Sequence, residues 1–375
     1  MTSTRGAGHF GPLRVFADAF RRQGHRVLVA IPADAVEMVE RAGHEAWPLA
    51  EPDAAVRDAI FGRTAGVSDD EANAIVVGEL FAGLYARASL PGVLAAVDEF
   101  APDVILHESS EYAGPLAAER AGIPAVHVCF GLSTLGDATI GWAARHVDAL
   151  RREHGLAPDP RGERLYDRLS LSLMPPALDG ASPLRHFREP RPEPGPPPAA
   201  WNGDRRPLVY LSFGSVAPAS DAYPALYRAA IERLAALPIR LLVSTGGQDP
   251  AALAPLPEGV VAERWVDEPP LGHHAAAMVS HGGAGSIRTA LASGLPLVVM
   301  PLFGDQPHNA RAVAAAGAGI ALEEGPGGLA EALAAVLEDP AYGRRAGEIA
   351  EEVAALPSVH DAVAVLREQV GRAAA

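Results

Sequence analysis

The sequence predicts an α/β protein built from two doubly wound domains, each with a parallel sheet between layers of helices. Strand and helix patterns alternate through both halves of the chain, which is typical of βαβ units. A proline-rich stretch separates the two halves. The length of 375 residues also exceeds what one ordinary hydrophobic core organises, so two domains are expected.

The first half carries clear strand signals. Compact apolar runs bounded by turn residues predict strands over 26–31, 102–107 and 123–128. One helix is expected around Phe16 and another over 113–121. A further strand should come before these, yet only residues 1–4 precede Arg5. We therefore expect either a very short first strand or an upstream extension of about four to six apolar residues.

The second half repeats this alternation. Its expected strands span 208–213, 239–244, 260–263, 277–280 and 297–300. The residues before them are dense in proline, which removes ladder donors and favours extended backbone, so 186–206 is expected to be a linker. A final helix is announced by Pro357 and by a capping box formed by Ser358 and Asp361. The predicted organisation is a first domain, a linker, a second domain and a terminal helix packing on the first domain, at 1–185, 186–206, 207–356 and 357–375.

Composition excludes several kinds of partner. A formal net charge of -15 repels phosphate backbones, so nucleic acid is not an expected partner. The single cysteine, Cys129, lies in an apolar run, which predicts a buried thiol and fits a reducing cytoplasm. No stretch approaches the roughly 18 apolar residues of a membrane helix, and no leader pattern is present. We expect a soluble cytoplasmic monomer or homodimer.

The strongest local signal is a glycine-rich turn. The expected strand 277–280 leads into residues 281–286, which read His-Gly-Gly-Ala-Gly-Ser, and a helix follows. Glycines allow a ligand to approach the backbone, and a helix start offers unpaired N–H groups to phosphate. The His281 imidazole can add a donor. The alternative is a glycine-rich turn that binds nothing.

A second polar pair follows the next expected strand. Asp305 can cap a helix that has Pro307 in its first turn. Its carboxylate, together with the Gln306 amide, can also bind sugar hydroxyls beside a diphosphate. Both interpretations can hold, because a capping aspartate keeps one oxygen for a ligand.

These landmarks resemble the UDP-glycosyltransferase-like enzymes of glycosyltransferase family 1. That family has the GT-B architecture of two facing Rossmann-like domains, and its bacterial members that decorate natural products are the most similar. The resemblance runs in the family's order through most of the chain. Its motifs are Gly8-His9-x-x-Pro12, the strand from Pro102 to Glu108, Ser212-Phe213-Gly214-Ser215, Trp265-Val266, His281-Gly-Gly-x-Gly-Ser and Asp305-Gln-x-x-Asn309.

The resemblance implies that His9 is the general base. A hydroxyl acceptor is a poor nucleophile near neutral pH, and the ordinary histidine pKa of about 6.5 suits removal of its proton. Glu108 would hold the imidazole and stabilise its charged form. Glu111 is the alternative acid, and His107 receives no role. Without the resemblance, a lone histidine is more often a structural, hydrogen-bonded side chain than a base, and the family context reverses that preference for His9.

The resemblance also implies a nucleotide-sugar site in the second domain. The helix start, His281 and the Ser215 hydroxyl would stabilise the departing diphosphate without a metal. Trp265 would stack on the base, although Asp267-Glu268 replaces the family's next dipeptide and a core tryptophan is the alternative. The implied donor-binding residues are Ser215, Trp265, Val266, His281, Gly283, Gly285, Ser286, Thr289, Asp305 and Gln306.

Thr289 predicts the nucleoside. Many family members have a glutamate at this position, where it contacts the ribose diol. Threonine is shorter and neutral, which favours thymidine diphosphate donors because their deoxyribose lacks the 2′-hydroxyl. The alternative is that Thr289 only packs in its helix.

The predicted function is that of an inverting, metal-independent glycosyltransferase with no cofactor beyond its nucleotide-sugar co-substrate. A small hydrophobic natural-product acceptor would bind in the first domain along residues 53–89 and 132–150. Two alternatives remain at this point. One is a nucleotide-sugar epimerase of the same architecture, and the other is a non-catalytic helper protein.

Overall fold

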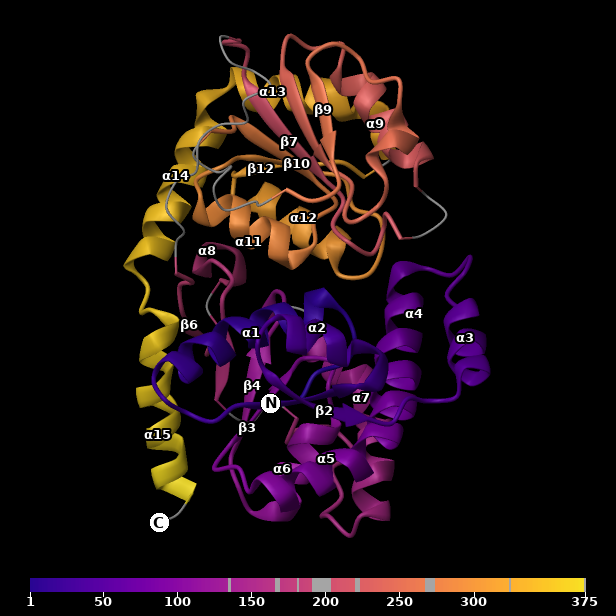
Figure 1. Ribbon diagram of the computed structural model, residues 1–375, viewed down its shortest axis with the longest axis vertical. Coiled ribbons are helices and arrows are strands. Elements are labelled where there is room, and N and C mark those ends of the chain that lie inside the picture. The colour runs from indigo at the N-terminus through magenta and orange to yellow at the C-terminus, as the bar shows by residue number, and fades with distance from the viewer. Residues whose placement is uncertain are drawn as a thin grey trace. The chain divides into compact units, whose positions relative to one another are not determined.

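The computed structural model covers the whole chain and divides it into two compact units (Figure 1). The first unit comprises Met1–Leu173, Ala181–Glu189 and Pro357–Ala375, and the second comprises Met174–Gly180 and Pro190–Leu356. Both are α/β, as the sequence predicts. The residues that the structure describes are 1–133, 136–165, 169–180, 182–190, 204–219, 223–266, 274–323 and 325–373.

The second unit is organised around a six-stranded parallel sheet. Its strands lie in the order β12-β11-β10-β7-β8-β9. Numbered along the chain this is 6-5-4-1-2-3, the order of a doubly wound fold, and its direction reverses between β7 and β10. The strands are β7 (Leu208–Ser212), β8 (Arg240–Ser244), β9 (Val260–Glu263), β10 (Ala277–Ser280), β11 (Leu297–Val299) and β12 (Gly319–Ala321).

Helices cover this sheet on both faces. Helices α9 and α13 pack on each other and share one core with the sheet, while α11 contacts β10 and α14, and α12 contacts β12. Successive strand residues point to opposite faces, so buried runs such as β7 can serve both helix layers. The helices are α8 (Pro176–Asp179), α9 (Ala225–Leu234), α11 (Ala284–Ala292), α12 (Gln306–Ala315), α13 (Leu329–Glu338) and α14 (Pro340–Ala355).

The first unit has a sheet in two parts. Strands β1 and β2 form a parallel pair, and β3-β4-β5-β6 form a parallel group of four. The two parts are bridged by Thr2, which makes parallel bridges to Ala30 on one side and His107 on the other, and Met1 and Ser3 add hydrogen bonds to β1. The expected first strand is thus reduced to one bridging residue. The strands are β1 (Leu28–Pro32), β2 (Glu45–Leu49), β3 (Ile105–Glu108), β4 (Ala125–Cys129), β5 (Ser170–Ser172) and β6 (Arg185–His186).

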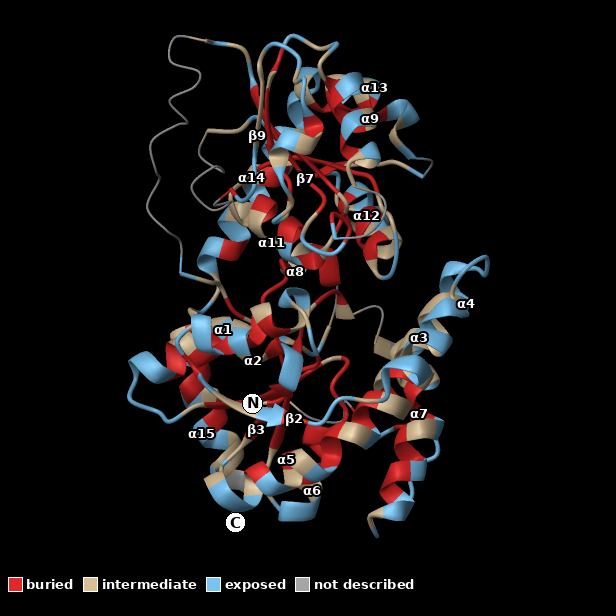
Figure 2. Cartoon of the chain, turned by 45° about the vertical axis from the view of Figure 1, so that its right-hand side comes forward, coloured by how far each residue is buried: buried red, intermediate tan, exposed pale blue. Residues whose placement is uncertain are grey.

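Side chains on the two faces of this sheet pack into two separate hydrophobic cores. Val29 and Leu106 pack with α1 and α15, whereas the neighbouring Ala30 and Ile105 pack with α5 and α6. Figure 2 shows buried residues concentrated along the strands and the inward helix faces. The predicted thiol burial is confirmed, since Cys129 is buried in β4. The helices are α1 (Ala7–Arg22), α2 (Val36–Arg41), α3 (Ala54–Gly62), α4 (Asp69–Ala74), α5 (Ala86–Phe100), α6 (Ala113–Ala121), α7 (Gly136–Glu153) and α15 (Ala362–Ala373).

One expectation about composition is wrong. Helix α4, a π-helical stretch η2 (Ile75–Tyr85) and α5 form one continuous helix, Asp69–Phe100, that is long and apolar enough by composition to cross a membrane. A core helix of a soluble protein passes the same test. Here Leu80, Leu90 and Val93 are buried in the first unit's core against α6 and α7.

The linker also differs from expectation at its start. Residues 185–186 form strand β6, which pairs with β5. Arg188 then bridges to Ser358, so these residues belong to the first unit together with the capping box and α15. The predicted capping box at Ser358 and Asp361 is present. The proline-dense residues 191–203 lie outside the described part of the chain.

Candidate active site

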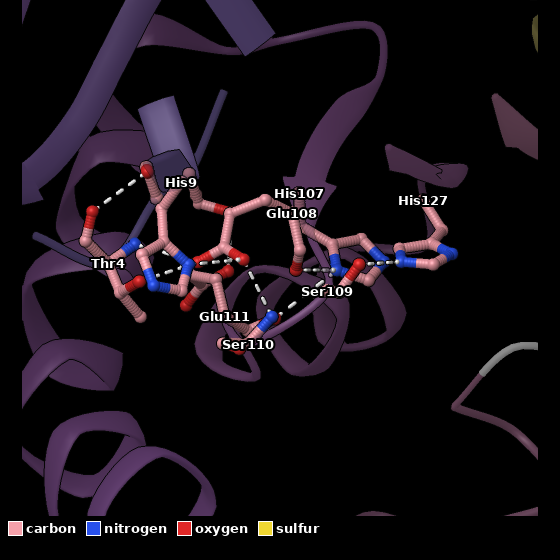
Figure 3. Close-up of polar contacts among 10 residues, drawn as sticks. Thr4, His9, His107, Glu108, Ser109, Ser110, Glu111 and His127 are labelled. Atoms are coloured by element: carbon pink, nitrogen blue, oxygen red, sulfur yellow. Dashed lines mark hydrogen bonds and ion pairs between the residues drawn. The ribbon is translucent and has the colours of Figure 1, made fainter. Parts of the chain in front are cut away.

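A histidine–carboxylate pair occupies the carboxyl edge of the first unit's sheet (Figure 3). His9 Nδ1 lies 3.1 Å from Glu108 Oε2. The His9 side chain is 22% exposed, whereas the Glu108 side chain is fully buried. His9 lies in the first turn of α1. The turn before it needs Gly6, whose φ of 110° is favourable only for glycine.

Glu108 is held by hydrogen bonds from three sides. Its Oε1 accepts from the Thr4 amide at 3.0 Å and the Thr4 hydroxyl at 2.7 Å, and its Oε2 accepts from the Ser110 amide at 2.7 Å. Burial would raise the pKa of this carboxyl. The charge of His9 and the hydrogen bonds from His9, Ser110 and Thr4 outweigh burial and lower the pKa to about 2. Glu108 is therefore an ionised partner fixed in one orientation.

Glu111, the alternative acid, binds other partners than His9. Its carboxylate accepts from the Thr2 hydroxyl and from the amides of Ala113 and Gly114 at 2.7 and 2.8 Å, so it caps α6. Burial raises its pKa to about 7 against the opposing hydrogen bonds. The geometry thus pairs Glu108, and not Glu111, with His9.

Two phenylalanines flank the His9 ring. Phe130 and Phe81 meet it edge-on, with ring centroids 4.9 and 5.5 Å away. Phe130 follows β4 directly, and Phe81 comes from η2. Aromatic edges at these distances restrict the imidazole to one plane and make its surroundings apolar. His107, as expected, points elsewhere and contacts backbone carbonyls of Glu108 and Glu111.

In the second unit, the glycine-rich turn lies where the strand order reverses. Ligands of open α/β sheets bind at such a switch point, outside the carboxyl ends of the strands. The loops after β7 and β10 meet there around His281. A Cβ added at Gly214 or Gly283 would come within 2.8 and 2.5 Å of its ring, so the imidazole fits only because both residues are glycine. Burial lowers the pKa of His281 to about 4, against the opposing hydrogen bond with the Ser212 backbone, so the ring is neutral.

The comparisons with known proteins agree with this arrangement. Residues 18–182 and 228–369 match the N-terminal and C-terminal domains described as erythromycin biosynthesis protein CIII-like. The chain is 32% identical to L-demethylnoviosyl transferase of Streptomyces niveus over 89% of this chain and 87% of that protein. The chain belongs to the CIII-like family of glycosyltransferases. The family resemblance predicted from the motifs is confirmed.

Other relatives extend the likeness over nearly the whole length of this glycosyltransferase. The elloramycin glycosyltransferase of Streptomyces olivaceus is 30% identical over 98% of this chain and 96% of that protein. Among solved structures, SnogD from Streptomyces nogalater matches with a TM-score of 0.79, 24% identity and 98% coverage of both chains. The spinosyn rhamnosyltransferase complexed with thymidine diphosphate matches with a TM-score of 0.78 at 23% identity, covering 98% of this chain and 99% of that one. These structures show the GT-B fold, and the named relatives favour neither an epimerase nor a non-catalytic helper.

The start of α11 offers the backbone groups that the sequence predicted. Gly283 is its N-cap and makes no side-chain capping bond, so the first N–H groups are not covered by a capping side chain. Gly285 is exposed and Ser286 is buried. Thr289 lies one turn further along the same helix and is half-buried.

The Asp305–Gln306 pair is arranged differently from the sequence interpretation. Asp305 sits at the N-cap of α12 but makes no capping bond, because its Oδ2 accepts from Asn309 Nδ2 at 2.7 Å. Gln306 is buried, and its Oε1 accepts from the amides of Leu302 and Phe303. Gln306 therefore shapes the loop with its oxygen, while Asp305 stays half-buried at its surface.

The remaining predicted donor residues lie at loop ends of the second unit. Trp265 is 66% exposed, which argues against a core tryptophan, and Val266 beside it is buried. Ser215 is exposed in the loop after β7. The dipeptide Asp267-Glu268 lies outside the described residues. Among the described parts of the chain, no group of three or more metal-ligating side chains is found.

Sequence reasoning missed four residues of this site. Thr4 and Ser110 orient Glu108, and Phe81 and Phe130 flank His9. Phe130 carried a usable signal, because it lies two residues after the expected strand 123–128 and so close to the same sheet edge. Phe81 carried none, since it arrives from a helix distant in sequence.

Proposed function

We propose that this glycosyltransferase is an inverting, metal-independent enzyme that transfers a sugar from a thymidine diphosphate donor to a hydroxyl of a small apolar acceptor. The observation that most supports this is the pairing of His9 with the buried Glu108. Because Nδ1–H donates to the carboxylate, Nε2 carries the lone pair that accepts a proton.

The reaction follows from that tautomer. The acceptor O–H loses its proton to His9 Nε2 as its oxygen forms the new bond to the anomeric carbon. The bond from that carbon to the diphosphate oxygen breaks on the opposite face, and its electron pair leaves with the nucleoside diphosphate. Glu108 stabilises the imidazolium formed, and the configuration at the anomeric carbon inverts.

The leaving diphosphate is stabilised by the second unit. The uncapped N–H groups at the start of α11 carry the positive end of the helix dipole, and the neutral His281 can donate one hydrogen bond. These groups need no metal to balance the developing charge. The exposed Trp265 ring is suited to stacking on the base, and the Asp305 carboxylate to accepting from sugar hydroxyls.

The acceptor side is formed by the apolar helices around His9. Phe81 and Phe130 bring aromatic surface to within contact of the imidazole, and the residues 53–89 and 132–150 supply the surrounding helices. A flat, apolar acceptor that presents one hydroxyl to Nε2 fits these surroundings. The later part of the long apolar helix is buried in the first unit's core, and with one buried cysteine we propose a soluble, cytoplasmic enzyme.

The preference for thymidine diphosphate rests on Thr289, which offers no carboxylate to a ribose diol. It is supported by a structural neighbour that was solved with thymidine diphosphate. Thermal shift with each nucleotide tests it, since a ligand at a hundred times its Kd stabilises a protein by about 2.7 kcal/mol. We expect the larger shift with thymidine diphosphate. Thr289→Glu should move the preference toward uridine diphosphate, and Thr289→Gln, which lacks the charge, should not.

The reaction itself is tested with a panel of nucleotide sugars and an aglycone library. We expect nucleoside diphosphate release that depends on the acceptor and is unchanged by a chelator, and a glycoside whose anomeric configuration is opposite to the donor's. Release without acceptor, retention of configuration, or loss of activity with the chelator would each contradict a separate part of the proposal.

A further inference from the structure

A stretch of π-helix interrupts the long helix of the first unit. Helix α4, η2 and α5 are continuous, and η2 closes its turns with hydrogen bonds between residues i and i+5. Such turns are rare in proteins, and they frequently occur at functional sites. Phe81, which meets the His9 ring edge-on, lies in the middle of η2. The π-helical turns therefore lie where the long helix reaches the His9–Glu108 pair.

Two glycines of η2 receive one histidine of α7. A Cβ added at Gly83 would lie 3.2 Å from His146 Nδ1. A Cβ added at Gly78 would lie 3.5 Å from the same ring and 2.7 Å from the Trp142 carbonyl oxygen. Helix α7 contacts η2 along this stretch (Figure 1). Its close approach therefore requires glycine at position 78, and a side chain at position 83 would push on the imidazole.

The spacing of these glycines matches the π-helical turn. Residues i and i+5 lie on one face where the turn closes between them, and Gly78 and Gly83 both face α7. In an α-helix of 3.6 residues per turn the two glycines would lie about 140° apart. Phe81, three residues after Gly78, would then share a face with that glycine, toward α7. In η2 it instead lies on the side that meets His9.

The imidazole between the glycines is neutral and is held in one orientation. Burial and the charge of Arg145 lower the pKa of His146, with the Glu79 charge opposing. Arg145 Nε donates to His146 Nε2 at 3.0 Å, so the ring proton is on Nδ1, which faces Gly83. Glu79 accepts two hydrogen bonds from Arg63, directly after α3. The middle of η2 is thus fixed from two neighbouring helices.

We propose that the contact of η2 with the His146 imidazole is a positioning device. It holds η2 in its π-helical register and so keeps Phe81 against His9. The inference rests on the proposed function, in which His9 is the base and Phe81 lies on the acceptor side. The register of η2 then sets how closely an acceptor hydroxyl approaches His9 Nε2.

Proton NMR of the whole chain gives a test that needs no activity. The His9 Cε1–H resonance, assigned by its absence in His9→Gln, senses the Phe81 ring current because the ring centroids are 5.5 Å apart. Gly83→Ala should shift this resonance in the same direction as Phe81→Ala, since the crowded imidazole pushes η2 out of register. Gly141→Ala, at an exposed position of α7 where a Cβ would meet no described atom within 4 Å, is the matched control and should shift nothing. An unchanged resonance in Gly83→Ala would overturn the proposal.

Steady-state kinetics give the second measurement. Gly83→Ala and His146→Ala should each raise the acceptor KM about tenfold, the usual scale for one misplaced packed side chain, and leave nucleotide affinity unchanged. Because both act through Phe81, neither should add a further loss in a Phe81→Ala background. Losses that add to that of Phe81→Ala would show that the contact supports only the fold. His146→Ala keeps the test decisive if Gly83→Ala does not fold, since it removes a ring and crowds nothing.

The two measurements also separate this inference from the proposed function. If His9→Ala keeps near-normal turnover, His9 is not the base, and the His9 resonance in Gly83→Ala still decides whether the contact positions Phe81. If His9→Ala is inactive but neither the resonance nor the acceptor KM changes in Gly83→Ala and His146→Ala, the reaction stands and the positioning device is wrong.

Discussion

Each unit places a histidine at the carboxyl edge of its sheet, and the two histidines have opposite surroundings. His9 is paired with an ionised, fully buried carboxylate and keeps part of its ring exposed. His281 is wedged between two glycines, and burial lowers its pKa to about 4. The first environment favours an imidazole that gains a proton, and the second favours one that stays neutral. One residue type at comparable edges is thus suited to a base in one unit and to a hydrogen-bond donor in the other.

Removing His9, the proposed base, should have the largest effect. His9→Ala is expected to lower kcat by about two to four orders of magnitude, the usual scale of general-base catalysis, with little change in nucleotide affinity. Steady-state kinetics and nucleotide titration measure the two quantities. His25→Ala, at an exposed position of the same unit, serves as the control and should leave both unchanged. Near-normal turnover in His9→Ala would remove the distinction between the two histidines.

Substitutions of the two acids should have the next largest effect, and their effects on kcat should differ. Glu108→Gln keeps the shape of the side chain but loses the charge that stabilises an imidazolium, so kcat should fall by roughly a hundredfold. Glu111→Gln should lower kcat by less than about threefold, since Glu111 contacts Thr2 and the start of α6 rather than His9. Equal losses in the two variants would mean that the carboxylates act as one structural unit.

The glycines beside His281 give an intermediate effect. Gly283→Ala puts a Cβ 2.5 Å from His281 Nε2, so the ring must move. We expect about tenfold weaker nucleotide binding and a Tm lower by about 3 °C or more. Gly285→Ala, whose Cβ meets no atom within 4 Å, should leave the Tm unchanged or slightly higher. A normal Tm for Gly283→Ala would show that the His281 pocket is not tightly packed.

The smallest expected effect concerns pH and stability. A folded-state pKa of about 7 for Glu111, raised from 4.5, means that its protonated form stabilises the fold below pH 4.5 and that this contribution is lost as pH rises to about 7. Glu108 acts in the opposite sense, and its contribution is lost as pH falls from 4.5 toward 2. Relative to the unchanged chain, Glu111→Gln should therefore gain a few °C in Tm between pH 5 and 7.5. A pH-independent difference would contradict the raised pKa.

Much of the fold was predictable because strands buried on both faces are continuous apolar runs. The strands near 208, 240 and 278 were found for that reason, and α6 was predicted with its observed bounds. Strand β6 was not, since it is two polar residues at a sheet edge within proline-rich sequence. The apolar character of 69–100 was underestimated because charged residues interrupt its apolar runs, although the helix buries residues between Gly78 and Ala96.

The position of a site residue was predictable where that residue stands at the end of a strand. Glu108 was preferred to Glu111 because it ends a strand, and the structure pairs it with His9. The partners that set its pKa were not predictable. Thr4 reaches Glu108 from more than a hundred positions away, and only the bridging of Thr2 between two strands brings it there.

Asn309 has a consequence for how a donor is recognised. Its side-chain amide donates both to the Gly282 carbonyl and to Asp305 Oδ2. These two hydrogen bonds connect the loop before α11 to the start of α12. A ligand group that displaces Asp305 therefore also displaces the glycine-rich turn. The diphosphate and sugar parts of a donor should then bind non-additively, and the affinity of a nucleoside diphosphate alone understates the selectivity of the enzyme for the intact nucleotide sugar.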